Sequence, residues 1–246
     1  MFTFFTKKTF LIDYLDGFID IHNHLLPGID DGAKTVEDSI TLLKEFSSFG
    51  VTNFVATPHI MNNYYPNTPD SIRKSHALLQ NALLQNDLKD ISISASAEHM
   101  IDDNFEDILE KNEVMPLRKN YLLVEMSYLQ PSINFNEAIN KIASHRLFPI
   151  LAHPERYVFL HKSSSLYQKH KSQGILFQLN LLSLGNYYGS EVQKAAHKLL
   201  ENGLIDFAAS DCHNITQLNA LKELKLSNKT LQKILPVLEN TIYNFY

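Results

Sequence analysis

Residues 18–32 read Phe-Ile-Asp-Ile-His-Asn-His-Leu-Leu-Pro-Gly-Ile-Asp-Asp-Gly, a short apolar run that leads into two histidines one residue apart. On a β-strand alternate side chains point to the same face, so His22 and His24 would direct both imidazoles into one space. The Pro-Gly and Asp-Asp-Gly turns that follow place carboxylates on an adjacent loop. An isolated His-x-His pair is more often a simple polar turn than a metal site, so the prediction depends on whether the chain repeats this design.

Composition predicts a soluble, cytoplasmic protein with one large domain. The chain has 246 residues, of which 44% are hydrophobic, and its net charge is −5 with neutral histidines. This acidic balance, without a run of Lys and Arg, argues against a nucleic-acid partner. Cys212 is the only cysteine, which excludes an internal disulfide and favours a reducing compartment. We find neither a secretory cleavage pattern nor an apolar stretch of membrane-spanning length, and therefore expect no membrane insertion.

Strand-like and helix-like segments alternate along the chain. The predicted strands span residues 18–21, 51–56, 91–97, 121–124, 148–152, 174–179 and 205–209. Apolar periodicity and capping residues predict helices over residues 35–49, 69–88, 104–111, 135–145, 163–172, 189–202 and most of 218–246. Seven strands that alternate with helices predict an α/β fold in which parallel strands close into a barrel. Residues 1–17 are expected to form an N-terminal extension, and residues 18–246 a single domain that includes the helical tail.

Metal-binding side chains occur at or just after the ends of six of these strands. They are His22, His24, Asp31, His59, Glu98, Glu125, His153, Asp211 and His213. In a β/α barrel the carboxyl ends of the strands converge on one face, where active sites are built. Each residue alone has an ordinary explanation as a turn or surface residue, but nine together at one rim do not.

Four clustered carboxylates require positive charge, which divalent ions supply. The mixed His, Asp and Glu set suits two or three ions, with Mn as the first choice and Fe or Zn as alternatives. The other six histidines fall on predicted helices or loops, or beside a candidate ligand, and are expected to be structural. Strand alternation points Cys212 away from the site, so we expect it to pack in the core.

These motifs resemble the polymerase and histidinol phosphatase (PHP) domain, and within it the capsule-associated tyrosine-protein phosphatases of the CpsB/YwqE type. The resemblance rests on His22-x-His24, Leu-Pro-Gly-Ile-Asp-Asp-Gly, Thr57-Pro58-His59, Glu98, Glu125, Ala-His153-Pro-Glu-Arg156 and Ser-Asp211-x-His213. It extends from about residue 18 to residue 213. It implies a distorted seven-stranded TIM-like barrel, the PHP fold, with three metals.

The resemblance also assigns the ligands. His22, His24, Glu98 and Asp211 would hold the first metal. Glu98 would bridge to a second metal, which Glu125 and His153 complete. Asp31, His59 and His213 would hold the third.

The sequence offers fewer candidates for substrate binding than for metal binding. Arg156 is the candidate that binds the phosphoryl oxygens, because its guanidinium can neutralise them. His59 is a candidate to assist departure of a phenol leaving group. Tyr64 and Tyr65 could stack beside an aromatic substrate, although packing within their loop is at least as good an explanation. The resembled phosphatases often carry a second arginine after Asp-x-His; here Asn214 follows His213, and Lys222 is the nearest candidate cation.

The sequence thus predicts a metal-dependent phosphomonoesterase. The first hypothesis is a protein-tyrosine phosphatase that acts on a bacterial tyrosine kinase of capsule or exopolysaccharide assembly. The alternatives are a small-molecule phosphatase, such as a histidinol-phosphate phosphatase, and a non-catalytic, metal-stabilised interaction module. Metal identity, the physiological substrate and the oligomeric state stay open.

Overall fold

The computed structural model describes residues 8–161 and 164–246, and it is an α/β fold with parallel sheets, as predicted. Residues 1–7 of the predicted extension and residue 163 of a predicted helix lie outside the described residues. The strands are β1 (Lys8–Phe10), β2 (Ile19–Asp20), β3 (Asn53–Ala56), β4 (His59–Ile60), β5 (Ser92–Ala95), β6 (Glu98–Met100), β7 (Tyr121–Glu125), β8 (Phe148–Ala152), β9 (Leu176–Asn180), β10 (Phe207–Ala209) and β11 (Lys225–Ser227). The α-helices are α1 (Val36–Ser47), α2 (Pro69–Gln85), α3 (Phe105–Glu110), α4 (Phe135–Ser144), α5 (Val158–His161), α6 (Ser164–Ser172), α7 (Ser190–Glu201), α8 (Ile215–Lys222) and α9 (Asn228–Phe245). Short 3-10 turns lie between some of them.

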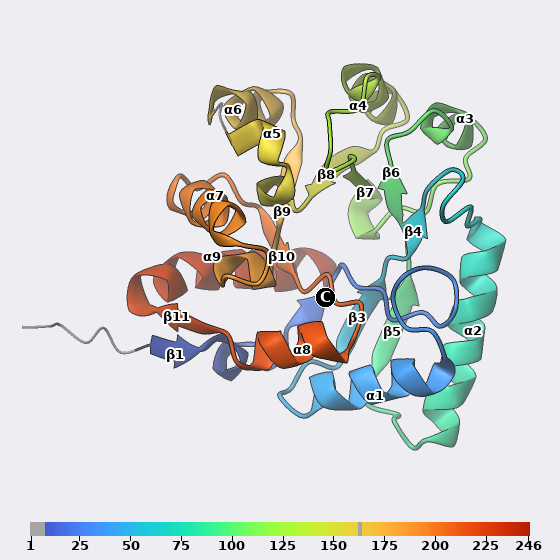
Figure 1. Ribbon diagram of the computed structural model, residues 1–246. Helices are drawn as coiled ribbons and strands as arrows, with labels where there is room; N and C mark the ends of the chain where they lie inside the picture. The colour runs from blue at the N-terminus through green and yellow to red at the C-terminus, as the bar shows by residue number, and fades with distance from the viewer. Residues whose placement is uncertain (1–7, 162–163) are drawn as a thin grey trace, which may run out of the picture.

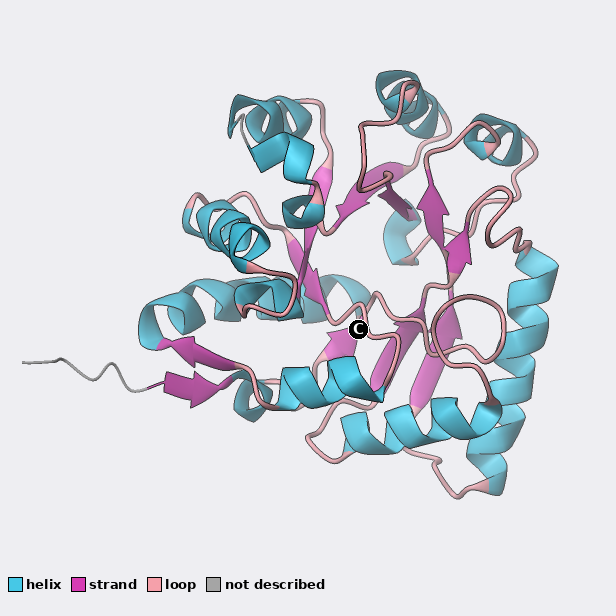
Figure 2. Ribbon diagram, in the orientation of Figure 1, coloured by secondary structure: helices cyan, strands magenta, loops and turns pink. Residues whose placement is uncertain are grey.

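Two parallel sheets form the centre of the molecule, and the helices surround them (Figures 1 and 2). One sheet has the order β10-β9-β8-β7-β6-β4, and the other has the order β2-β3-β5. Backbone contacts join the ends of the first and last parallel strands: Asp211 N donates to His22 O (2.8 Å), and His24 N donates to Cys212 O (2.9 Å). These contacts bring together two segments that are about 190 residues apart in the chain.

Two of the predicted strands are each followed, after a two-residue break, by a second short strand. Thr57-Pro58 separates β3 from β4, and Ser96-Ala97 separates β5 from β6. After each break the chain changes sheets, because β3 pairs with β2 and β5 whereas β4 pairs with β6. Since proline has no N–H to donate, Pro58 suits such a break in the ladder. The prediction ended these strands just before His59 and Glu98; in the structure each of these residues begins a second short strand.

Helix α1 illustrates how local sequence determines an element. Thr35 caps it: the Thr35 hydroxyl accepts from Asp38 N, and the Asp38 carboxylate accepts from Thr35 N, which forms a capping box. Its buried face includes Leu43 and Phe46. The Phe46 ring meets Phe54 of β3 edge-on, with 5.4 Å between the centroids, so α1 is fixed against the sheet.

The core divides into two apolar clusters. The larger lies between strands and helices and includes Phe54, Leu151, Leu43 and Ile139. The smaller collects alternate residues of the parallel strands and is sealed by Phe245 of α9; its members are Ile19, Ile21, Val55, Leu117, Leu123, Ile150, Ala152, Phe207, Ala209 and Phe245. Because alternate strand residues contribute to different clusters, the strands have apolar contacts on both faces.

The two ends of the described chain meet. Strand β1 pairs antiparallel with β11, and Leu11 and Leu15 are buried in the larger cluster. Residues 8–17 are thus packed against the rest of the domain. The tail prediction was too simple: a strand, β11, separates two helices where one mostly helical segment was expected. In the described part of the chain no helix has both the length and the apolarity needed to cross a bilayer.

Candidate metal centre

The nine predicted ligands meet at the carboxyl ends of the parallel strands. Seven of them are buried, whereas His213 is partly buried and the Asp31 side chain is 48% exposed. The ligand atoms of eight of them, all but His153, fall into three overlapping groups, in each of which all atoms lie within 4.8 Å of one another. The strand topology therefore concentrates these side chains as the barrel geometry anticipated.

The first group consists of His22, His24, Glu98 and Asp211. His22 Nε2 lies 3.1 Å from Glu98 Oε2 and 3.3 Å from Asp211 Oδ1. His24 Nε2 lies 3.5 Å and 3.4 Å from the same two oxygens. Two imidazole nitrogens thus face two carboxylate oxygens around one point. These four residues are the set that the family resemblance assigned to the first metal.

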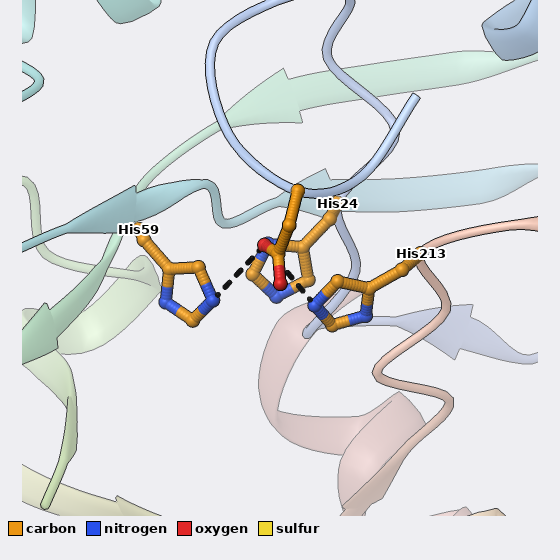
Figure 3. A group of neighbouring side chains, drawn as sticks. His24, His59 and His213 are labelled. Atoms are coloured by element: carbon orange, nitrogen blue, oxygen red, sulfur yellow. Dashed lines mark ion pairs between the residues drawn. The ribbon is translucent and has the colours of Figure 1, made fainter. Parts of the chain in front are cut away.

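The second group consists of His24, Asp31, His59 and His213 (Figure 3). Asp31 Oδ1 lies 3.4 Å from His59 Nε2 and 3.6 Å from His213 Nε2. The rings of His24 and His213 stack, with 3.8 Å between their centroids. The predicted third-metal set reappears here, with His24 added to it.

The third group consists of His59, Glu98 and Glu125. His59 Nδ1 lies 3.1 Å from Glu98 Oε2 and 2.9 Å from Glu125 Oε1. The resemblance placed His153 with these two carboxylates. In the structure His153 Nε2 approaches the other Glu98 oxygen, Oε1, at 3.1 Å, and it also lies 3.3 Å from the Tyr128 hydroxyl.

The donor set fits divalent cations. Seven buried side-chain polar atoms in the described residues make no hydrogen bond of acceptable geometry, and four belong to these ligands: His59 Nδ1, His153 Nδ1, Glu98 Oε2 and Glu125 Oε1. His59 Nδ1 lies within 3.1 Å of the two carboxylate oxygens, as an ion-pair contact without hydrogen-bonding geometry. Buried polar atoms are normally paired, and buried carboxylates need positive charge beside them. Oxygen and imidazole donors together suit Mn, Fe and Zn.

Protons and metal ions compete for this centre. Burial lowers the pKa of His24 and of His59, but neighbouring carboxylates outweigh burial and hold both pKa values well above 6.5. Burial likewise raises the pKa of Glu98 and of Asp211, yet adjacent histidines bring both well below their usual range. His213 differs, because burial and the charge of His24 lower its pKa to about 4. Without a cation, imidazolium ions would neutralise the carboxylates.

Two residues that the sequence analysis missed orient the ligands. Gln178 of β9 accepts a hydrogen bond from His22 Nδ1 at 2.8 Å, and Asp30 accepts one from His24 Nδ1 at 2.8 Å. Such contacts fix each ring so that Nε2 would be free to bind a cation. Asp30 also accepts from His59 N, at 3.2 Å. The pattern drew attention to Asp31, although its neighbour Asp30 is the buried member of the Asp-Asp pair.

Arg156 is held at the edge of the centre. Its guanidinium carbon lies 4.5 Å from the Tyr128 ring centroid and 4.3 Å from the Tyr188 ring centroid. Arg156 Nη1 donates to Asp211 Oδ2 at 2.7 Å, and Asn180 Nδ2 donates to the same oxygen at 2.8 Å. Asp211 therefore presents Oδ1 to the first group while its other oxygen fixes Arg156.

A cavity of about 1020 Å³ opens above the centre, and Arg156, Tyr64 and Tyr65 line it. Tyr65 stacks on His59, with 5.4 Å between centroids, whereas Tyr64 is 77% exposed. Among the described residues, Arg156 is the only Lys or Arg in the lining. Lys222 is not there: it pairs with Glu45 of α1, with 2.7 Å between Nζ and Oε2. The idea that Lys222 replaces a second arginine is therefore wrong.

The remaining histidines and the cysteine have structural contacts. His99 is buried between Leu123 O, to which its Nδ1 donates at 2.9 Å, and Met115 N, from which its Nε2 accepts at 3.1 Å. Burial lowers its pKa to about 4. Cys212 is buried, as expected. None of the six histidines assigned to structure belongs to a potential metal-binding group in the described residues.

The fold and the site together define a parallel α/β protein with a His/Asp/Glu centre at the carboxyl ends of its strands. A similar fold is found in the solved structures of YwqE from Bacillus subtilis and CpsB from Streptococcus pneumoniae, described as metal-dependent tyrosine phosphatases; the TM-score is 0.81, with 28% identity over 92% of this chain and 94% of the other. An organophosphorus hydrolase from Deinococcus radiodurans, with a TM-score of 0.51 and 11% identity over 95% and 94% of the two chains, shares the fold.

The family is CpsB/CapC, described as capsular polysaccharide synthesis; its model matches residues 18–234, and the chain belongs to it. Tyrosine-protein phosphatase YwqE of Bacillus subtilis is 30% identical over 82% of this chain and 79% of its own length. Tyrosine-protein phosphatase CpsB of Streptococcus pneumoniae is 29% identical over 80% of this chain and 83% of its own.

Proposed function

We propose that this protein is a metal-dependent protein-tyrosine phosphatase of capsule or exopolysaccharide synthesis. The observation that carries the proposal is the set of three overlapping ligand groups that opens into a cavity beside Arg156. The names of the relatives, tyrosine-protein phosphatases YwqE and CpsB, support the same activity. We further propose cytoplasmic localisation and, as substrate, a tyrosine-phosphorylated kinase of polysaccharide export.

We also propose that the strands close into a distorted seven-stranded barrel, with residues 18–246 as the phosphatase domain. Counting β3 with β4 and β5 with β6 gives seven parallel strands. Closure is supported by the Asn23–Cys212 bridge and by the apolar cluster that collects alternate strand residues.

For the metals we propose the assignment that the family resemblance implies, with two or three ions, Mn first and Fe or Zn as alternatives. Bound divalent ions would activate water near neutral pH and offset the negative charge of a phosphoryl group. The protein's own contribution is to hold the donors in place, since Gln178 and Asp30 fix the rings of His22 and His24.

Arg156 is the proposed phosphate-binding residue. Its guanidinium has five N–H donors, of which one is engaged with Asp211, and the rings of Tyr128 and Tyr188 restrict its movement. A positioned guanidinium can bind the non-bridging oxygens of a phosphoryl group without reorganising. Tyr64 and Tyr65 remain candidates for contact with the aromatic ring.

We propose His59 as a metal ligand in preference to an acid. Its Nε2 faces Asp31 and its Nδ1 faces Glu98 and Glu125, so both ring nitrogens point at carboxylates of the ligand groups. Metal binding at these nitrogens would leave neither free to donate a proton to a leaving group.

The proposal is tested by comparing two substrates with the Mn-loaded protein, a phosphotyrosyl peptide and histidinol phosphate. We expect turnover of the peptide, loss of that turnover in His153→Ala, and normal turnover in His145→Ala. His145 is the matched control because it lies on the exposed end of α4 and contacts only local groups. Turnover of histidinol phosphate alone would contradict the proposal and indicate a small-molecule phosphatase. No turnover of either compound with full metal content would indicate an interaction module.

A further inference from the structure

Two aliphatic side chains project into solvent at the mouth of the cavity. Leu129 is 92% exposed and Ile133 is fully exposed, which makes them the most exposed large apolar side chains of the described residues. Both line the cavity above the metal centre. Single exposed leucines are common on protein surfaces, but a pair at the entrance of a catalytic cavity calls for an explanation.

The loop that carries them, residues 126–134 between β7 and α4, is tied down at its base. Met126 N donates to the Tyr157 hydroxyl at 3.0 Å. The Ser132 hydroxyl donates to Ile101 O at 2.7 Å, and Asn134 Nδ2 donates to Asp102 O at 3.1 Å. Ile133 lies between these last two anchors, so its exposure is a consequence of a fixed loop. The surface is therefore formed before any ligand binds.

Other parts of the cavity wall are also apolar. Met61 and Tyr64 come from the loop between β4 and α2, and Met100 and Ile101 come from the end of β6 (Figure 1). The Asp102 carboxylate accepts from Asn62 N at 2.7 Å, which joins this loop to the segment after β6. Methionine and aromatic side chains are suited to contact varied apolar groups.

The charged side chains near the mouth of the cavity are acidic. Asp102 and Asp103 line the cavity, and Arg156, the one Lys or Arg in the lining of the described residues, is bonded to Asp211. Bound metals would offset Glu98, Glu125 and Asp211 but would not lie against Asp103, whose Oδ1 is 2.9 Å from Asn62 Nδ2. An acidic group that enters beside the phosphate would therefore be repelled.

The cavity is also larger than a phosphotyrosyl side chain requires. Its volume of about 1020 Å³ is at the upper end of the ~300–1000 Å³ typical of pockets that enclose whole drug-sized ligands. Space remains for the residues on either side of the phosphorylated tyrosine.

We propose that the outer wall formed by Leu129, Ile133, Met61 and Tyr64 is a docking surface for the polypeptide segment around the phosphotyrosine. It selects segments whose neighbouring residues are apolar and not acidic. This inference rests on the proposed phosphatase function and specifies its substrate class. The occupant is an extended segment of a protein substrate, because the wall is preformed, apolar and continuous with the metal centre.

The test uses phosphotyrosyl peptides of equal length that differ only in the residues beside the phosphotyrosine, which are Leu, Ser, Lys or Glu. We measure kcat/KM with the Mn-loaded full chain, and p-nitrophenyl phosphate serves as a substrate without flanking residues. Burial of leucine-sized groups predicts a kcat/KM about 10-fold higher for the Leu peptide than for the Ser peptide. The Glu peptide should be the poorest of the four, by about 3-fold or more relative to Ser.

Variants test whether Leu129 and Ile133 cause the preference for the Leu peptide. In Leu129→Ser/Ile133→Ser the preference for the Leu peptide over the Ser peptide should fall to about 2-fold or less. Leu84→Ser is the matched control: Leu84 is 65% exposed on α2 and does not line the cavity, so the preference should stay near 10-fold. Asp103→Asn keeps an oxygen for Asn62 and should raise kcat/KM for the Glu peptide by about 3-fold.

The outcomes separate this inference from the function on which it rests. Hydrolysis of p-nitrophenyl phosphate without hydrolysis of any phosphotyrosyl peptide would overturn the phosphatase assignment itself. Hydrolysis of all four peptides at equal rates would leave that assignment standing and overturn the docking surface. A preference that survives in Leu129→Ser/Ile133→Ser would likewise contradict it.

Discussion

The floor of the cavity is buried and charged, whereas its outer wall is exposed and apolar. Glu98 and Glu125 on the floor are at most 1% exposed, while Leu129 and Ile133 on the wall are at least 92% exposed. The floor is built on strand ends, and the wall is built on the loops that follow strands β4 and β7. A rigid sheet thus positions the groups that would perform the chemistry, and loops provide the contacts that would select a substrate.

This difference predicts different sensitivities. A floor residue contacts several charged neighbours, so its replacement should affect metal content and turnover together. A wall residue has few neighbours in the protein, so its replacement should change which substrate is preferred. The following predictions test that distinction, beginning with the largest effect.

Glu98→Gln should have the largest effect, because Glu98 is shared by two of the three ligand groups. The amide removes a negative charge beside His22 and His59, so at least one ion should be lost. We expect kcat/KM for a phosphotyrosyl peptide to fall by at least about 1000-fold. Kinetics and elemental analysis on the same sample measure this. Glu110→Gln, at an exposed ion pair with Lys141, is the control, and normal metal content in Glu98→Gln would contradict the ligand assignment.

Gln178→Ala should have an intermediate effect on metal affinity and turnover. Without Gln178 Oε1, the His22 ring loses the acceptor that fixes its Nδ1–H. Loss of such a partner typically costs 10- to 100-fold in metal affinity or activity, and we expect a decrease in that range. Metal titration and kinetics provide the measurement. Gln193→Ala, whose side chain contacts Leu184 O, should behave as wild type; equal behaviour of the two variants would remove Gln178 from the account.

Without metal, the stability of the protein should depend on pH in a way that the stability of the metal-loaded protein does not. In the metal-free protein the pKa values of His22, His24 and His59 are raised by their carboxylate neighbours. The stability that these protonated histidines contribute is complete below about pH 6.5, the unfolded value, and is lost as the pH rises through their folded pKa values.

Because metal ions displace the same protons, metal affinity should rise over the same pH range. The Tm difference between loaded and metal-free protein should therefore widen above pH 6.5, by about 3–5 °C per pH unit for each proton displaced at constant excess metal. Differential scanning calorimetry with Mn and with EDTA measures the difference. A difference that narrows as the pH rises would show that protons and ions do not share these ligands.

Lys222→Ala should have the smallest effect. Lys222 lies outside the cavity lining and pairs with a half-exposed Glu45, so we expect kcat/KM within about twofold of wild type and a loss of stability below about 1 kcal/mol. Peptide kinetics and chemical denaturation measure the two quantities. A large loss of turnover would restore Lys222 as a phosphate-binding cation.

The sequence predicted the floor of the cavity better than its wall, for a physical reason. The period of two in a strand and the convergence of strand ends in a parallel fold bring His22, His24 and Glu98 together before any coordinates are known. The short strands β4 and β6 were missed because two or three residues are too few to show a periodicity. The pairing of β1 with β11 was missed because it joins segments more than 200 residues apart, a contact that no local pattern encodes.

Gln178, Asn180 and Tyr188 illustrate the same limit. Gln178 and Asn180 occupy alternate positions of β9 and contact His22 and Asp211. Amide side chains in an apolar strand are, however, only a weak sequence signal of a functional site. Tyr188 packs against Arg156 only because the chain after β9 returns to the centre. Leu129 and Ile133 lie in a loop with no periodicity, so their position at the cavity mouth required the structure.

Anomalous diffraction from crystals of the Mn-loaded protein would locate each bound ion. We expect two or three manganese peaks at the carboxyl ends of the strands, with His22, His24, Glu98 and Asp211 around one of them. A protein that hydrolyses phosphotyrosyl peptides in solution yet shows no metal peak among these side chains would contradict this expectation.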